Sequence, residues 1–235
     1  MIAGLQKMTL LDYPGKVACT VFLQGCNFRC PFCHNSDLLG ADGPEQIPLE
    51  TLMAFLKKRV GLLDAVCVTG GEPTLQKDLP ELLKQIKDLG YLVKLDTNGA
   101  KPRVLQALVE AGLVDYVAMD IKNSPEKYGS TAGVPNMTLS PIEESIRYLL
   151  AGNVDFEFRT TVADELHEAE DFARIGQWLE RLYPGKKAEK FFIQPYVDRD
   201  SVLASGLHTP PEKKLNSMVQ AISPYVWGAN LRGVD

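Results

Sequence analysis

Three cysteines stand close together in the chain: Cys26, Cys30 and Cys33, with C-x3-C-x2-C spacing. They follow the apolar run 17–23, which has the pattern of a buried strand. Three thiolates on one loop can converge on one metal centre. A structural zinc site takes four ligands, usually as two separated pairs, and a fourth ligand is hard to find here. Three thiolates suit a 4Fe–4S cluster that leaves one iron open for a substrate.

The remaining thiols and the neighbouring histidine are weaker ligand candidates. Cys19 and Cys67 lie inside predicted strands, so we expect both to be inert core thiols. His34 follows Cys33 so closely that it would strain a tetrahedral site. It could tune a cluster through a hydrogen bond, or simply pack. Five cysteines with three of them clustered favour a reducing compartment over a disulfide framework.

Polar residues follow several other predicted strands. Paired glycines in Gly70-Gly71-Glu72-Pro73 let the backbone approach a ligand closely, and Glu72 offers an acceptor to a cationic group. The alternative is an ordinary tight turn. Asp96, Thr97 and Asn98 supply oxygen and amide groups, although Asn98-Gly99 is also a strong turn signal.

Charged residues end the later strands in the same way. Asp120 and Lys122 are two residues apart and project to the same side, either toward a ligand or as an ion pair. Arg159 suits a carboxylate through its planar guanidinium, and the alternative for it is a structural salt bridge.

Short apolar strands alternate with amphipathic helices along the chain. This alternation predicts a parallel α/β sheet with right-handed crossovers. The polar residues fall at the carboxyl ends of successive strands, which is the edge that holds the active site in parallel barrels. Six units indicate a partial (β/α)6 TIM-like barrel. The strands are expected at 17–23, 65–69, 92–96, 116–120, 156–162 and 190–194.

We expect one domain over 1–235: an N-terminal segment 1–16, the barrel 17–222 and a tail 223–235 that could add a short strand. Capping boxes are predicted before two helices, at Ser140-Pro141-Ile142-Glu143 and at Thr209-Pro210-Pro211-Glu212.

Composition narrows the class of protein. The 235 residues are 45% hydrophobic and 23% charged, which is ordinary for a globular protein. The net charge of −5 argues against a nucleic-acid binder. The N-terminus lacks the charged and apolar regions of a signal peptide, and no long apolar run is present, so we expect a cytoplasmic protein without a membrane anchor.

The cysteine spacing, with Phe32 before the last cysteine, resembles the signature of the radical S-adenosylmethionine (SAM) enzymes. The wider string, from Leu10-Leu11-Asp12-Tyr13-Pro14-Gly15-Lys16 to Cys33-His34-Asn35, resembles the activating enzymes of glycyl-radical enzymes. Within these it is most similar to the activating proteins of anaerobic ribonucleoside-triphosphate reductase. Pyruvate formate-lyase activators commonly read Asp-Gly-Pro-Gly where this chain has Asp12-Tyr13-Pro14-Gly15.

The resemblance implies a partial (β/α)6 barrel, a 4Fe–4S cluster on the three loop cysteines, and SAM bound at its open iron. It implies reductive cleavage of SAM to a 5′-deoxyadenosyl radical, which takes hydrogen from a glycine of a partner enzyme. A monovalent cation near Asp96, Thr97 and Asp120 is a weaker expectation. The SAM contacts expected with the resemblance are Phe32, Gly70, Gly71, Glu72, Pro73, Asp96, Thr97, Asn98, Asp120, Lys122 and Arg159.

The expected partner is anaerobic ribonucleoside-triphosphate reductase, with flavodoxin or ferredoxin as electron donor and no nucleic acid or membrane. Alternatives are an activase of the pyruvate formate-lyase type, and a radical SAM enzyme acting on a small molecule or peptide. The non-enzymatic alternative is a zinc or iron–sulfur binding protein.

Overall fold

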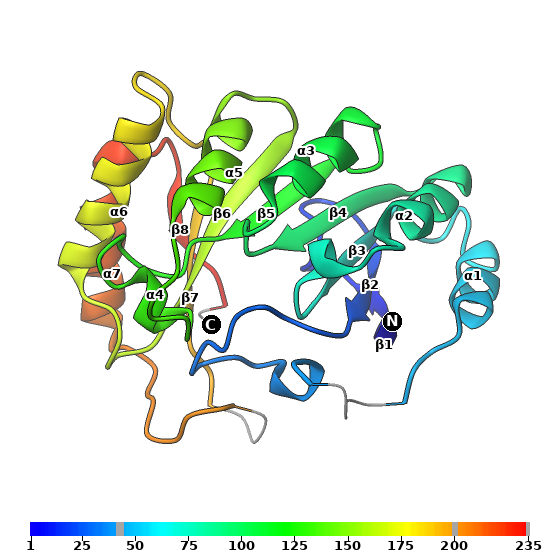
Figure 1. Ribbon diagram of the computed structural model, residues 1–235, viewed down its shortest axis with the longest axis horizontal. Helices are drawn as coiled ribbons and strands as arrows, with labels where there is room; N and C mark the ends of the chain where they lie inside the picture. The colour runs from blue at the N-terminus through cyan, green and yellow to red at the C-terminus, as the bar shows by residue number, and fades with distance from the viewer. Residues whose placement is uncertain (41–44, 199–201, 234–235) are drawn as a thin grey trace. The chain divides into compact units, whose positions relative to one another are not determined.

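The computed structural model describes residues 1–40, 45–198 and 202–233. Strands and helices alternate along the chain (Figure 1). The strands are β1 Ile2–Thr9, β2 Ala18–Leu23, β3 Ala65–Gly70, β4 Leu92–Thr97, β5 Tyr116–Asp120, β6 Asp155–Val162, β7 Phe191–Pro195 and β8 Ala229–Leu231. The α-helices are α1 Leu49–Lys57, α2 Leu79–Asp88, α3 Pro102–Glu110, α4 Tyr128–Thr131, α5 Ser140–Leu150, α6 Ala169–Leu182 and α7 Glu212–Ile222. Short 3-10 turns are η1 Ser36–Leu38, η2 Pro73–Leu75 and η3 Ser223–Tyr225.

Two compact units make up the described chain. The first unit comprises residues 1–27, 35–97 and 103–118, and the second unit comprises 28–34, 98–102 and 119–235. Each is described by itself below. The expectation of a single domain stays a prediction.

The first unit is built on β1 to β4. β1 pairs antiparallel with β2, whereas β2, β3 and β4 run parallel, with Ala18 opposite Ala65 and Ala65 opposite Leu92. The parallel strands are continuous apolar runs because both faces of such a sheet are covered. Cys19 and Val66 are accordingly fully buried. Helix α2 turns its own apolar face inward through Leu79, Leu83 and Ile86.

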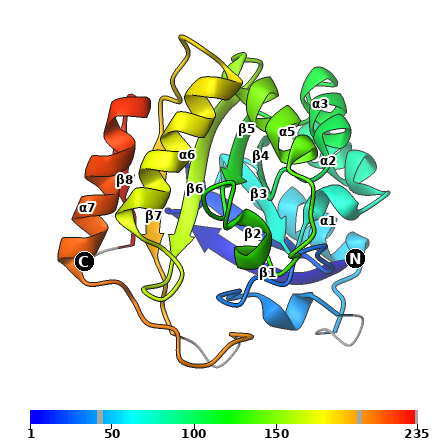
Figure 2. The same cartoon turned by 60° about the vertical axis from the view of Figure 1, so that its left-hand side comes forward.

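The second unit is built on the parallel strands β6, β7 and β8. Helices α6 and α7 lie side by side in both views (Figures 1 and 2). Three fully buried rings, Phe158, Phe172 and Phe191, form an aromatic cluster in this unit. Phe191 meets Phe172 of α6 edge to face and Phe158 at a tilt.

The C-terminal strand is attached to the second unit by charge as well as by backbone pairing. Arg232, just past β8, donates from Nη1 and Nη2 to the two carboxylate oxygens of Glu157 at 2.5 and 2.9 Å. Its guanidinium carbon lies 3.5 Å from the ring centroid of Phe192. Glu157 is fully buried, so the guanidinium compensates a charge that is withdrawn from water.

The predicted strand–helix alternation is confirmed, and so is the α/β class with an open parallel sheet. The short terminal strand is confirmed at β8. Strand β1 was not predicted from the sequence.

Both predicted capping boxes are wrong. Ser140 is the first residue inside α5 and does not cap it, because the N-cap position is Leu139 and has no side-chain cap. Thr209 donates its hydroxyl to Tyr196 O instead of capping α7. The capping box that the structure does contain joins Glu168 and Asp171 at the start of α6.

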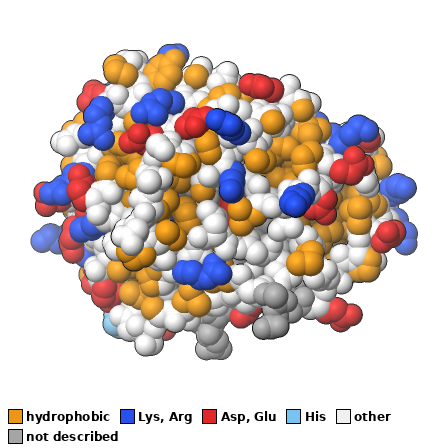
Figure 3. Space-filling model, in the orientation of Figure 1, with side chains coloured by type: hydrophobic (Ala, Val, Ile, Leu, Met, Phe, Trp, Pro, Cys, Tyr) orange, Lys and Arg blue, Asp and Glu red, His pale blue; other side chains and the backbone are white. Residues whose placement is uncertain are grey.

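Within the described ranges, no helix is long and apolar enough to cross a membrane. On the face shown in Figure 3, basic and acidic side chains are interspersed.

Candidate active site

The cysteine loop follows β2 as irregular chain. Cys30 is buried, whereas Cys26 and Cys33 are partly exposed. All five cysteines lie within the described chain and none is in a disulfide bond. A backbone hydrogen bond of 3.1 Å from Cys33 N to Cys30 O forms a tight turn between the last two. The loop therefore presents three reduced sulfurs of the type that iron–sulfur clusters take as ligands.

The other thiols differ from these in environment. Cys19 and Cys67 are fully buried, and burial raises the pKa of Cys19 to about 12. Burial also raises the pKa of Cys67, more than the nearby Lys94 charge lowers it. Both are therefore protonated and unreactive, in agreement with their expected role as core thiols.

No three His, Cys, Asp or Glu side chains among the described residues are placed to hold a single metal ion.

The Gly70-Gly71 turn packs directly on the start of the cysteine loop. A Cβ on Gly70 would lie 2.2 Å from Leu23 O, and Gly70 has a φ of +119°. A Cβ on Gly71 would lie 2.1 Å from Gly25 O and 3.2 Å from Cys26 N. Glycine is thus needed at both positions for close backbone approach. The donor set and this packing fit a loop that holds a cluster.

Glu72 is oriented by three hydrogen bonds to one carboxylate oxygen. Its Oε1 accepts from Thr74 N at 3.1 Å, from Thr74 Oγ1 at 2.5 Å and from Thr97 Oγ1 at 2.8 Å. The side chain is 1% exposed. Pro73 begins the short turn η2 that Glu72 caps. Glu72 and Thr97 were predicted as site residues at the ends of different strands, and the structure joins their side chains by a hydrogen bond.

Asp96 and Asn98 have other neighbours. Asp96 is ion-paired with Lys94, which is two residues earlier on the same strand and almost fully buried. Asn98 Oδ1 accepts from Ala100 N at 3.0 Å, which gives the turn geometry that Asn98-Gly99 predicted.

Three charged side chains meet at the end of β5 in the second unit. Asp120 Oδ2 accepts from Lys122 Nζ at 2.9 Å, and Asp120 Oδ1 accepts from Arg159 Nε at 3.0 Å. Arg159 Nη2 is 2.9 Å from the same oxygen. Two cations therefore surround one carboxylate.

The pKa values of this cluster follow from its charges. Burial would raise the pKa of Asp120, but Arg159 and Lys122 outweigh it and lower that pKa to about 2. Burial would lower the pKa of Lys122, but the Asp120 charge outweighs it and raises that pKa. Asp120 and Lys122 are therefore both ionised at neutral pH.

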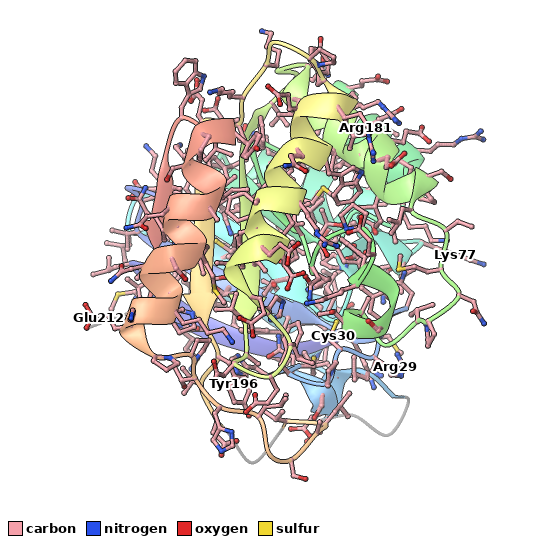
Figure 4. The ribbon with its side chains drawn as sticks, turned by 90° about the vertical axis from the view of Figure 1, so that its left-hand side faces the viewer. Arg29, Cys30, Lys77, Arg181, Tyr196 and Glu212 are labelled. Atoms are coloured by element: carbon pink, nitrogen blue, oxygen red, sulfur yellow. The ribbon has the colours of Figure 1, made fainter. Side chains whose placement is uncertain are left out.

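The part of the cysteine loop that belongs to the second unit makes further contacts within that unit. Figure 4 shows Arg29 and Cys30 beside α4, and Arg29 N donates to Ala132 O at 2.9 Å. His34 Nε2 lies 2.8 Å from Val197 O, and its ring stacks on Tyr196 at a centroid distance of 5.6 Å. His34 therefore packs against the chain after β7.

Phe32 and His167 form a contact that sequence reasoning missed. Phe32 is 3% exposed, and its ring meets the fully buried His167 ring edge to face with centroids 6.0 Å apart. Nothing in the local sequence marks His167, because its partners come from distant segments.

Comparison with known proteins gives the family. Residues 20–175 match the model of the radical SAM superfamily. The chain belongs to the radical SAM superfamily. A 4Fe–4S cluster and SAM are therefore its cofactors.

Two relatives match nearly the whole chain. A Methanocaldococcus jannaschii protein, provisionally named a glycyl-radical enzyme activating enzyme, is 29% identical over 248 residues, covering 100% of this chain and 97% of its own. The pyruvate formate-lyase 1-activating enzyme of Escherichia coli is 30% identical over 240 residues, covering 94% of each chain. The chain is thus an enzyme of the glycyl-radical-activating class, which acts on a glycyl-radical partner enzyme.

Solved structures agree on the fold. A domain of a pyruvate formate-lyase-activating enzyme from Bacteroides vulgatus has a TM-score of 0.57 at 20% identity, covering 72% of this chain and 99% of its own. SuiB of Streptococcus suis, in its complex with SAM, has a TM-score of 0.66 at 13% identity, covering 91% of this chain and 51% of its own. The expected partial barrel of the radical SAM type is confirmed.

Proposed function

We propose that Cys26, Cys30 and Cys33 hold the 4Fe–4S cluster and that the protein activates anaerobic ribonucleoside-triphosphate reductase. The observation that supports the cluster site best is the packing of Gly71 on the backbone at Gly25 and Cys26, where no Cβ has room. The turn proposed to bind SAM therefore packs directly against the start of the cysteine loop.

Two sets of charged residues are proposed to contact SAM. Glu72 is held in one orientation by Thr74 and Thr97, and its negative charge suits the SAM ammonium. Lys122 and Arg159 are cations, which suits the SAM carboxylate.

The other predicted contacts have smaller roles. Buried Phe32 would present its ring near the adenine, and Asp96 and Asn98 would line the end of β4. When bound, the cluster and SAM supply the one-electron chemistry that yields a radical able to take hydrogen from a glycine Cα. This chain would bind, orient and exclude water. A monovalent cation at Asp96, Thr97 and Asp120 stays a prediction.

The choice of partner is supported by the segment before β2. Asp12-Tyr13-Pro14-Gly15-Lys16 differs from the Asp-Gly-Pro-Gly pattern of pyruvate formate-lyase activators. The relative from Escherichia coli supports pyruvate formate-lyase as the second candidate. A flavodoxin or ferredoxin donor and a cytoplasmic location also stay predictions.

Alanine substitutions test the cluster ligands. After anaerobic reconstitution, Cys26→Ala, Cys30→Ala and Cys33→Ala should each lose bound iron and the formation of 5′-deoxyadenosine from SAM. Cys67→Ala is the matched control, because this thiol is fully buried and should leave iron content unchanged. Full iron content in a loop variant would contradict the assignment, and zinc without iron in the wild type would contradict the cluster itself.

Purified partners test the reaction. The reduced, SAM-loaded enzyme is mixed separately with anaerobic ribonucleoside-triphosphate reductase and with pyruvate formate-lyase. A glycyl EPR signal should appear with the reductase. A signal with the lyase alone would transfer the assignment to the second candidate, and 5′-deoxyadenosine without a radical on either protein would favour a small-molecule or peptide substrate.

A further inference from the structure

Three consecutive carbonyls at the end of β5 are each bonded by a side chain from elsewhere in the second unit. Tyr128 Oη donates to Asp120 O at 3.3 Å, and Thr160 Oγ1 donates to Ile121 O at 2.8 Å. His167 Nε2 lies 2.9 Å from Lys122 O. Tyr128, Thr160 and His167 are at most 1% exposed, so these bonds form in a dry environment where geometry is strongly specified.

The bonds of His167 fix its protonation. Lys122 O can only accept, so His167 Nε2 carries the hydrogen and donates it. Nδ1 is then the acceptor for Ala163 N at 3.2 Å. Burial lowers the pKa of the ring, more than its hydrogen bonds raise it, which keeps this neutral form at physiological pH.

The same ring also contacts the cysteine loop. Phe32 lies between the ligands Cys30 and Cys33 in sequence and meets His167 edge to face at 6.0 Å. One side chain thus contacts both the loop and the backbone that carries Lys122.

We propose that His167 is a positioning residue for SAM. Its Nε2 hydrogen bond fixes the position of the backbone at Lys122, and its ring fixes the orientation of the Phe32 ring. This inference depends on the proposed function, in which Lys122 and Phe32 contact SAM. In this proposal His167 acts through Lys122 and Phe32 and makes no contact of its own with SAM.

Two amide substitutions separate the two hydrogen bonds of His167. Gln in His167→Gln can place a donor where Nε2 stood, and so keeps the bond to Lys122 O. Asn in His167→Asn can place an acceptor where Nδ1 stood, and so keeps the bond from Ala163 N but cannot reach Lys122 O. Both lose the aromatic contact and each keeps a different hydrogen bond, so the variant that binds SAM more tightly shows which of the two bonds matters for SAM.

The test measures SAM affinity of the reconstituted enzyme by titration, together with the change that SAM causes in the EPR spectrum of the reduced cluster. His167→Asn should weaken SAM binding about tenfold, because a buried acceptor loses its donor. His167→Gln should stay within about threefold of wild type. Iron content should be unchanged in both. His208→Gln, at an exposed histidine in the same unit, is the control and should bind normally.

A purely structural role would lower the thermal stability of both amide variants without separating their SAM affinities. Wild-type affinity in His167→Asn, or equal losses in both variants, would overturn the proposal. If His167→Asn fails to fold, Tyr128→Phe removes the neighbouring donor to Asp120 O with minimal change of shape. It should weaken SAM binding severalfold, and unchanged affinity there would equally overturn positioning through this backbone.

Lys122→Met separates this inference from the proposed function. If Lys122→Met binds SAM normally, Lys122 is not a SAM contact and the proposed function fails at that residue. If it binds weakly while His167→Asn binds normally, only the inference about His167 fails. When both hold, His167→Asn should weaken SAM binding less in the Lys122→Met background than in the wild type, because the part of its effect that acts through Lys122 is already lost.

Discussion

Two carboxylates of this molecule, the buried Glu72 and the partly exposed Asp120, are held in opposite ways. Glu72 Oε1 accepts from a backbone amide and two hydroxyls, which carry no charge. Asp120 lies between the cations Lys122 and Arg159. The same chemical group is thus held by neutral donors in the first unit, here called the Glu72 region, and by cations in the second unit, here called the positive region.

The largest expected effect tests the packing behind the Glu72 region. Gly70→Ala places a Cβ 2.2 Å from Leu23 O at a φ of +119°, so the strand end must shift. We expect the free energy of unfolding to fall by roughly 1–3 kcal/mol beyond that of the control. Gly61→Ala is the matched control: Gly61 has a φ of +79° and nothing within 4 Å, so its cost is backbone strain alone, about 1 kcal/mol. Equal losses in denaturant titrations would mean that close approach is unimportant.

The second prediction tests the charge of Glu72. Glu72→Gln keeps a carbonyl acceptor for Thr74 and Thr97 but removes the negative charge. SAM affinity should fall about tenfold, since a hydrogen bond to a charged group is replaced by a neutral one. Iron content and the unfolding temperature should stay close to wild type. Loss of iron together with SAM affinity would show that Glu72 supports the cysteine loop instead.

The third prediction tests the positive region through its pH dependence. The pKa of Asp120 falls from 3.8 to about 2 in the fold, because Arg159 and Lys122 outweigh burial. A lowered carboxyl pKa adds stability that is full above pH 3.8 and is lost as the pH falls toward 2. The stability difference between wild type and Asp120→Asn should therefore shrink over that range in urea titrations. Asp88→Asn, in an exposed pair with Lys84, should show no such trend.

The smallest effect is expected at an exposed ion pair outside both regions. His208 Nδ1 contacts Glu165 Oε1 at 2.5 Å, with side-chain exposures of 73% and 37%. The hydrogen bond to Glu165 raises the pKa of His208 above its ordinary value. Glu165→Gln should bring that pKa back down in an NMR titration and leave SAM affinity unchanged. An unchanged His208 titration would show that the pair is not formed in solution.

The fold was largely predictable because its signals are local. Buried parallel strands such as 65–69 are unbroken apolar runs, and their helices carry one apolar face. β1 was missed because Gly4, Gln6 and Lys7 interrupt its apolar pattern. The capping boxes were predicted wrongly because the pattern was sought as a Ser or Thr at the N-cap, which pointed to 140 and 209. The capping box at the start of α6 is formed by Glu168 and Asp171 instead.

The site residues were predictable where polar or charged side chains lie at the end of a predicted strand. Asp120 and Lys122 are two residues apart, so their shared side followed from strand geometry. Arg159 pairs with Asp120 across 39 residues, and only the fold determines that contact. His167 reaches Lys122 across 45 residues, and a lone histidine in a polar segment gave no signal of it.

The Arg232 side chain, just past β8, has a practical consequence for how the protein can be truncated. A protease or a truncated expression clone that stops at Leu231 would keep strand β8 but delete Arg232, whose side chain bonds both oxygens of Glu157. A carboxylate with no solvent exposure would then have lost the counter-charge of Arg232, which is a costly change for a folded protein. Trimming a handful of terminal residues, ordinarily harmless, would weaken the sheet from within.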